Sequence, residues 1–298
     1  MGWDVSNCMA LPTQQLEDLF SKGLLVRPRP DLYILGVVHI GSKSARDAEV
    51  LIETVKPLNV VVEVPPSRLE YIRQKSPYRE NSETSETDQP NQRKKQSDKK
   101  SLVDMILLLP ALANIGYTKG GLSGLLFCII MFWPSLLKQA TISKEEEETL
   151  PRENEFEAAI FAAEKINANI IPADIEFDEL VRSAAKSMTP SQWVELSTNI
   201  LCESIGLKPK DPIKRGKDES LVVWETRRRD VKSARASQAH MEKSTPELSR
   251  VFVDKRNDKF ASACLNTLHN DEFKGESTVC IVGLVHLDGI AECISSEY

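Results

Sequence analysis

The sequence predicts an α/β fold in which a central, largely parallel sheet is flanked by helices. The chain has 298 residues, 41 % of them hydrophobic and 28 % charged, as in a soluble globular protein with a sizeable core. A buried strand, a helix and a second buried strand follow one another between residues 32 and 64. Two further strand patterns, at 169–177 and 279–286, each follow a helical pattern. This alternation is typical of a parallel sheet.

Residues 1–30 are predicted to form a short helix and a lead-in to the sheet. The segment 13–22 carries leucine and phenylalanine side chains along one side at helical spacing. The sequence RPRP at 27–30 ends this helix, because proline disfavours the helical conformation of the residue before it.

The clearest unit is the strand–helix–strand segment that follows. The stretch LYILGVVHIGS at 32–42 predicts a buried strand that runs into His39, and NVVVEV at 59–64 predicts a second strand containing Glu63. The helix between them has apolar residues at helical spacing, namely Ala45, Ala48, Ile52 and Val55. The connection between parallel strands is expected to be right-handed.

A polar insertion and an apolar segment interrupt the domain. Residues 74–101 contain one aromatic residue and no aliphatic one, so they are expected to form a disordered surface insertion. Residues 102–139 are the most apolar part of the chain and are predicted to be helical. The uncharged run at 120–137 has the minimum length of a transmembrane helix, although its glycines and Pro134 argue against that reading. The alternatives are a buried helical hairpin that covers the sheet, or a hydrophobic surface at 102–137 that contacts a partner or a membrane.

The remaining segments complete an α/β domain predicted over residues 31–290. In order, they are a helix at 153–168, a strand at 169–177, helices at 178–206, a polar helical segment at 207–250, a helix at 252–268, a strand at 279–286 and a C-terminal tail at 291–298.

Charge and cysteine content narrow the function classes. The net charge is −6, whereas nucleic-acid binding favours a basic surface, so no nucleic-acid partner is expected. Six cysteines without a C-x-x-C pair favour free thiols in a reducing compartment. The N-terminal residues lack the apolar stretch of a signal peptide. We therefore expect a protein that is cytoplasmic or peripherally attached to an intracellular membrane.

Polar residues lie in or after four of the predicted strands, where an open parallel sheet collects its ligands. They are His39, Glu63, Asp174 and His286. Histidines and carboxylates that converge from different strands can bind a divalent metal ion or act as an acid–base pair. The chain contains no G-x-S-x-G, H-E-x-x-H or G-x-G-x-x-G motif, which disfavours the common serine hydrolase, zincin and dinucleotide-binding readings.

Each of these residues also has a structural interpretation. A histidine that ends a core strand is often a hydrogen-bonded structural residue, and two of them in the same context favour a shared site only modestly. Glu63 lies in an apolar strand, so it needs a nearby cation. Arg68 is the nearest candidate in the sequence, and a simple Glu63–Arg68 ion pair is the alternative to a functional role.

Several of these motifs together resemble the TraB/PrgY family. The opening block of that family is matched by Gly36, His39, Ser42, Pro57, Glu63 and Arg68. The later blocks are matched in the same order by Glu155, Phe156, Ala159, Asp174, Arg256, Asn257, Phe260, Ala261, Gly283, His286, Gly289 and Ile290. The chain departs from the family pattern at Pro65, Ile175, Lys255 and Val285.

The resemblance implies a TraB/ChaN-like fold, related to the TIKI metalloproteases and the erythromycin-esterase group. It implies that His39, Glu63 and His286 bind a divalent metal ion, such as manganese, cobalt or zinc. It also implies catalytic, orienting or substrate-binding roles for a further set of residues. These are Glu63, Arg68, Glu155, Asp174 and Arg256.

Two functional hypotheses follow. The first is a metal-dependent hydrolase that cleaves a peptide or other small-molecule substrate, in which the ion activates water and an arginine stabilises the oxyanion. The second is a non-catalytic regulator or membrane-associated scaffold on the same fold. Retention of His39, Glu63 and His286 favours the first, and the departures from the family pattern favour the second.

Overall fold

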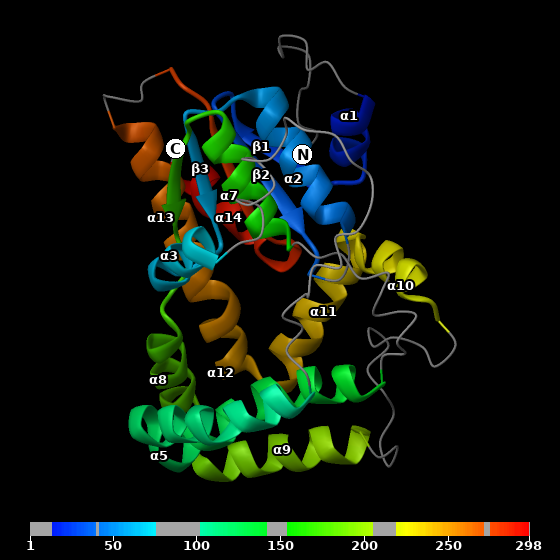
Figure 1. The fold of residues 1–298 in the computed structure, drawn as a ribbon, viewed down its shortest axis with the longest axis vertical. Coiled ribbons are helices and arrows are strands. Elements are labelled where there is room, and N and C mark those ends of the chain that lie inside the picture. The colour runs from blue at the N-terminus through cyan, green and yellow to red at the C-terminus, as the bar shows by residue number, and fades with distance from the viewer. Residues whose placement is uncertain are drawn as a thin grey trace, which may run out of the picture. The chain divides into compact units, whose positions relative to one another are not determined.

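The computed structural model describes residues 14–39, 42–75, 102–141, 154–204, 219–270 and 275–297 of this mixed α/β protein (Figure 1). The chain divides into two compact units. We call Met1–Leu69, Thr149–Glu176 and Asp211–Tyr298 the α/β unit, and Glu70–Glu148 with Phe177–Lys210 the helical unit. The predicted insertion at 74–101 lies outside the described residues except for its first two positions.

A five-stranded sheet with the order β1-β2-β5-β3-β4 forms the centre of the α/β unit. Strands β2 (Leu32–Val37), β5 (Thr278–Gly283), β3 (Asn59–Val62) and β4 (Asn169–Pro172) are mutually parallel, which confirms the predicted, largely parallel sheet. The sequence predicted only these four strands. The fifth, β1 (Leu25–Arg29), contains part of the RPRP segment and pairs antiparallel with β2 at the sheet edge. An edge strand tolerates proline because one side of it needs no backbone donor.

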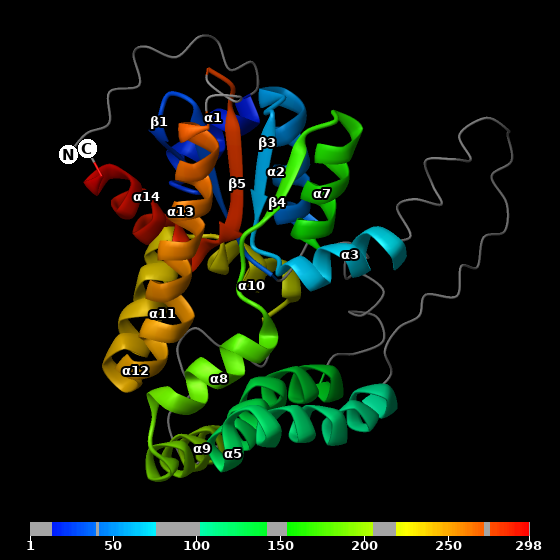
Figure 2. The ribbon, with the colours of Figure 1, turned by 90° about the vertical axis from the view of Figure 1, so that its left-hand side faces the viewer.

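Helices cover both faces of this sheet (Figure 2). Helices α2 (Ser42–Val55) and α7 (Glu155–Lys165) pack together on one face, and α13 (Lys255–His269) and α14 (Leu287–Ser296) on the other. The apolar side chains of α2 point into the core as their spacing predicts, and Ala48, Leu51 and Ile52 are fully buried. Helix α14 extends beyond residue 290, into the segment expected to be a tail.

Six further helices and helical turns are described in this unit. These are α1 (Gln14–Ser21), α10 (Leu221–Arg228), α11 (Val231–Ser244), α12 (Pro246–Ser249), the π-helical turn η1 (Arg250–Asp254) and the 3-10 turn η3 (Leu284–His286). Helix α3 (Pro66–Lys75) begins in the α/β unit and runs into the helical unit.

The helical unit contains α5 (Leu102–Thr141), α8 (Phe177–Ser187) and α9 (Pro190–Ser204). Helix α5 is interrupted at Gly121, whose φ of 59° and ψ of −145° are not helical. A Cβ at Gly124 would lie 2.2 Å from the carbonyl oxygen of Gly116, although residues eight apart in a straight helix are separated by about 12 Å. The chain therefore turns back on itself, and α5 is a helical hairpin.

The hairpin contains the apolar segment Leu109–Phe132, which is long and hydrophobic enough to cross a membrane by length and composition alone. Core helices of soluble proteins can have the same composition. Because the turn at Gly121 falls inside this segment, the segment is not one continuous helix. Phe127 packs edge-on against Trp193 of α9, at 5.8 Å between ring centroids, so part of the hairpin forms a hydrophobic core.

Candidate functional site

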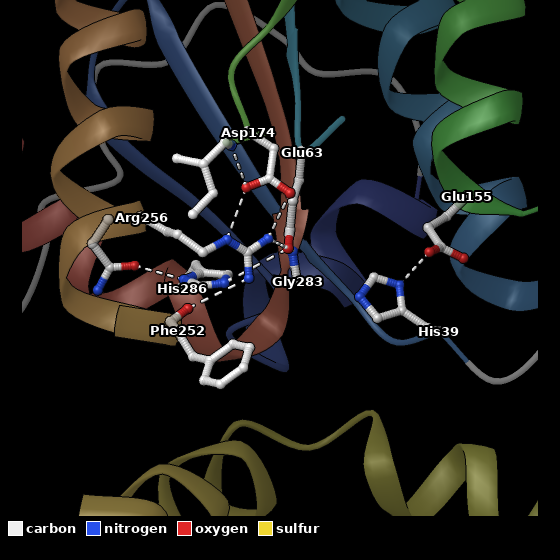
Figure 3. A network of polar contacts seen from close by, with 10 residues as sticks. His39, Glu63, Glu155, Asp174, Phe252, Arg256, Gly283 and His286 are labelled. Carbon is white, nitrogen blue, oxygen red and sulfur yellow. Dashed lines mark hydrogen bonds and ion pairs between the residues drawn. The ribbon is translucent and has the colours of Figure 1, made fainter. Parts of the chain in front are cut away.

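Polar side chains gather at the carboxyl edge of the sheet, as the strand pattern predicted (Figure 3). His39 follows β2, Glu63 follows β3 and Asp174 follows β4. His286 lies in η3, directly after β5. The strands are shorter than predicted. Glu63 therefore lies just beyond its strand, and His286 lies in a 3-10 turn.

Two further predicted residues reach this edge from helices. Arg256 comes from the second position of α13, and Glu155 is the first residue of α7. Asn154 begins α7 by accepting a hydrogen bond from the backbone N–H of Glu157 at 2.8 Å, which places Glu155 in the first turn beside the sheet edge.

Glu63 lies at the centre of the site and is buried. One carboxylate oxygen accepts a hydrogen bond from the backbone N–H of Gly283 at 2.5 Å, and the other accepts one from Arg256. Burial alone would raise the pKa of this carboxyl. The positive charge that His286, Arg256 and His39 can carry outweighs burial, and the N–H of Gly283 acts in the same direction, so the pKa of Glu63 lies below its usual value.

Arg256 joins two carboxylates. Its Nε and Nη2 donate to the two oxygens of Asp174 at 2.8 and 2.9 Å, and Nη2 also donates to Glu63. The guanidinium lies over the ring of Phe260, 5.5 Å from its centroid. A bidentate, stacked guanidinium of this kind is geometrically fixed, and lysine would not reproduce it.

His286 is buried, with 1 % of its side chain exposed. Its Nδ1–H donates to Oδ1 of Asn257 at 2.7 Å, and its Nε2 lies 3.7 Å from Oε1 of Glu63. Burial lowers the pKa of His286 to about 4, because the opposing charge of Glu63 is offset by Arg256 and His39. At neutral pH, His286 is therefore an uncharged imidazole.

His39 has the opposite environment. Its side chain is 54 % exposed, and its Nδ1 forms a hydrogen bond with the buried carboxylate of Glu155. Partial burial of the imidazole ring would by itself lower the pKa of His39. The hydrogen bond and charge of Glu155, aided by Glu63, outweigh that effect, so the pKa of His39 is raised.

The two imidazoles and Glu63 converge on Gly283. A Cβ placed on Gly283 would lie 3.2 Å from Oε2 of Glu63, 3.5 Å from Nε2 of His39 and 3.7 Å from Cδ2 of His286. These atoms of the two histidines therefore lie within about 7 Å of each other, at most 3.5 plus 3.7 Å. The predicted convergence of His39 and His286 is thus present in the fold.

Arg68 is the predicted site residue that the structure does not bring to Glu63. It is exposed on α3, whereas the guanidinium bonded to Glu63 is that of Arg256. Sequence reasoning missed the role of Asn257 beside His286. Its position next to Arg256 in the helix was the available indication, because neighbouring residues of one helix can both reach a sheet edge.

The described residues do not fit the metal centre that the family resemblance implies. Among them, no group of three or more histidine, cysteine, aspartate or glutamate side chains is arranged to hold a metal ion. Both oxygens of Glu63 already accept hydrogen bonds, and Arg256 supplies the neighbouring positive charge. The divalent ion therefore stays a prediction.

A scan against protein-family models found no match, and a search of curated proteins found none either. The resemblance to TraB/PrgY proteins therefore rests on the motifs alone. The geometry itself provides an exposed imidazole paired with a carboxylate, a buried neutral imidazole, and a carboxylate held as an anion by an arginine.

Proposed function

We propose that this protein is a hydrolase that uses acid–base chemistry at the carboxyl edge of the sheet. One observation carries the proposal, namely that His39 and His286 converge on Gly283 from opposite environments. Neighbouring titratable groups whose pKa values are pushed apart are typical of an acid–base pair. The resemblance to TIKI metalloproteases supports a peptide or other small-molecule substrate.

His39 is the group best placed to exchange a proton with a substrate. Half of its side chain is exposed, and Glu155 holds the ring through Nδ1, which leaves Nε2 directed towards Gly283. Because Glu155 favours the imidazolium, His39 suits the role of general acid that protonates a leaving group. An imidazole that is oriented by a neighbouring carboxylate is also found in many hydrolytic sites.

His286 and Glu63 complete the proposed site. Neutral His286 keeps a lone pair on Nε2 that can accept a proton, and Glu63 stays anionic beside it. Arg256 balances the negative charges of Glu63 and Asp174, which lets these carboxylates remain ionised while buried. In the proposed site, His39 is therefore the proton donor and His286 the proton acceptor.

The test is hydrolysis of a panel of peptide, ester and amide substrates by the purified chain. We expect activity to fall at least 100-fold in His39→Ala, since a general acid contributes about 10²–10⁴-fold. His240→Ala, on the exposed face of α11, is the matched control and should keep full activity. If no substrate is hydrolysed, or if His39→Ala retains the wild-type rate, the proposal is wrong.

The predicted divalent ion is tested separately. Elemental analysis of the purified chain and assays with and without a chelator would detect a bound metal. Stoichiometric manganese, cobalt or zinc that is lost in His39→Ala and His286→Ala would support a metal centre, with rearranged bonds around Glu63. Full activity in chelator with no bound metal would support the metal-free chemistry proposed here.

A second candidate function is membrane-associated regulation through the α5 hairpin, without catalysis. Only 28 % of the 18-residue hydrophobic window within Leu109–Phe132 is buried, whereas a core helix would be mostly buried. Among the side chains described over residues 109–132 of α5, the large apolar ones that are exposed are Tyr117, Leu122, Ile129 and Met131. Co-flotation of the chain with phospholipid vesicles, and its loss in Leu122→Glu/Ile129→Glu, would support this function. Failure of the wild-type chain to bind vesicles would exclude it.

A further inference from the structure

We infer that Asn257 is a positioning residue that holds His286 with its proton on Nδ1, so that the lone pair of Nε2 faces Glu63. Nδ1 of His286 and Oδ1 of Asn257 are 2.7 Å apart, and both side chains are buried. An amide oxygen can only accept a hydrogen bond, so the imidazole must be the donor in this contact. A neutral imidazole carries one proton, and this contact places it on Nδ1.

Gly289 provides an independent reason to assign this role to Asn257. A Cβ at Gly289 would lie 2.1 Å from Nδ2 and 2.9 Å from Cγ of Asn257, which is closer than real side chains approach. The backbone of α14 therefore leaves a space that the Asn257 amide fills. The glycine three residues after His286 is explained by this packing, since any larger residue would displace the asparagine.

The rest of the His286 environment fixes the ring but does not choose its tautomer. Phe260, four residues after Arg256 on α13, contacts the imidazole edge-on at 5.2 Å between ring centroids. Glu63 lies 3.7 Å from Nε2, too far for a hydrogen bond. Asn257 is therefore the group among the described contacts that decides which nitrogen is protonated.

The consequence is a pair of hydrogen-bond acceptors that face each other. In this tautomer, Nε2 of His286 and Oε1 of Glu63 both lack a proton, and they are 3.7 Å apart. A water molecule at the usual distance of about 2.8 Å from each could donate one O–H to Nε2 and the other to Oε1, which also accepts a hydrogen bond from Arg256. This pair of acceptors is the binding site that we assign to the attacking water. The assignment rests on the proposed hydrolase function.

The tautomer is tested by nitrogen-15 NMR of the histidine rings, which distinguishes protonated from unprotonated ring nitrogens without any substrate. We expect wild-type His286 at pH 7 to be protonated on Nδ1. Asn257→Leu, which keeps the size but removes the acceptor, should move the proton to Nε2, next to Glu63. Asn257→Asp keeps an acceptor oxygen and should retain the wild-type tautomer.

Gly289→Ala provides a second variant in which Asn257 itself is unchanged. Its Cβ should displace the amide and produce the same shift of the proton towards Nε2. Ser295→Ala, at an exposed position of the same helix, is the control and should leave the tautomer unchanged. Circular dichroism would confirm that each variant is folded. A wild-type ring protonated on Nε2 would overturn the inference even if no variant folds, and so would an unchanged tautomer in folded Asn257→Leu.

The activity measurement separates this inference from the hydrolase proposal. If wild type hydrolyses a substrate, Asn257→Leu should lower kcat at least tenfold with little change in KM, and Asn257→Asp should recover much of the loss. The expected NMR result without any hydrolysis would leave the positioning role intact and reject the enzyme. Hydrolysis with unchanged kcat in Asn257→Leu would reject the assignment of the acceptor pair to the reaction.

Discussion

His39 and His286 follow the neighbouring parallel strands β2 and β5, and each lies three residues after a glycine. Yet His39 is half-exposed and bonded to a carboxylate, whereas His286 is buried and bonded to an amide. The pKa of His39 is raised, and that of His286 is lowered to about 4. A shared motif therefore places both imidazoles at one edge of the sheet, while the Glu155 carboxylate beside His39 and the burial of His286 shift their pKa values in opposite directions.

The partners come from opposite faces of the sheet. Glu155 is carried by α7 on one face, and Asn257 by α13 on the other. A carboxylate stabilises the imidazolium by its charge, while an amide oxygen accepts a hydrogen bond from the ring without favouring the charged ring as strongly. The anionic charge of Glu63 raises the pKa of both histidines, so it adds to the shift of His39 and opposes the shift of His286.

Removal of Arg256 should have the largest effect on this arrangement. Arg256→Leu leaves Glu63 and Asp174 buried without their cation, and we expect it to lower the free energy of unfolding by about 3–5 kcal/mol. Urea denaturation at pH 7 measures this loss. Arg235→Leu is the matched control, because its ion pair with Asp288 is largely exposed and is expected to contribute about 1 kcal/mol or less. Equal losses in both variants would contradict a buried role for Arg256.

The contrast in protonation should also appear in the pH dependence of stability. The pKa of His286 is depressed to about 4 in the folded state, from 6.5 in the unfolded state, so the unfolded chain binds more protons between these values. Stability should therefore fall as the pH is lowered from 6.5 towards 4, by about 3 kcal/mol from this residue.

The contribution of His286 is measured as a difference between two chains. Urea unfolding at pH 7 and at pH 4.5 should show a smaller loss of stability in His286→Phe than in wild type, because phenylalanine does not titrate. His39 contributes with the opposite sign, since its raised pKa stabilises the fold below pH 6.5 and this stabilisation is lost as the pH rises through the folded value. Identical pH dependence in wild type and His286→Phe would contradict a neutral buried His286.

Glu155→Gln tests the other half of the contrast, with a smaller expected effect. The amide keeps a hydrogen-bonding group near His39 but removes the charge, so the pKa of His39 should fall from its raised value. A titration of the histidine ring resonances by NMR measures the change directly. Glu164→Gln, at an exposed position on the same helix, should leave the titration of His39 unchanged. A raised pKa that persists in Glu155→Gln would show that Glu155 does not set it.

The sequence predicts this site better than it predicts the contacts inside it. Parallel strands end at one edge of a sheet, so the strand pattern alone was enough to bring His39, Glu63 and His286 together. The contacts depend on which helix crosses that edge. Arg256 reaches Glu63 from 193 positions away in the chain, whereas sequence proximity suggested Arg68.

Other features could not be predicted for similar reasons. The protonation of His286 depends on burial and on the amide of Asn257, neither of which has a local sequence pattern. The antiparallel strand β1 could not be predicted because Pro28 argues against a strand, and an edge position is what permits it. The hairpin in α5 is one of several alternatives that the sequence allows, because the turn at Gly121 and the close approach of Gly116 to Gly124 depend on tertiary structure.

The smallest expected effect is that of Arg68→Ala. Since Arg68 is exposed on α3 and Glu63 is already bonded to Arg256, its loss should change the free energy of unfolding by no more than about 0.5 kcal/mol. Urea denaturation beside Arg256→Leu provides the measurement. A small loss of unfolding free energy in Arg68→Ala with a large loss in Arg256→Leu would show that the guanidinium that stabilises Glu63 comes from α13, next to neutral His286. A large loss at Arg68 would mean that α3 also supports Glu63, and that the positive charge is shared between the two helices.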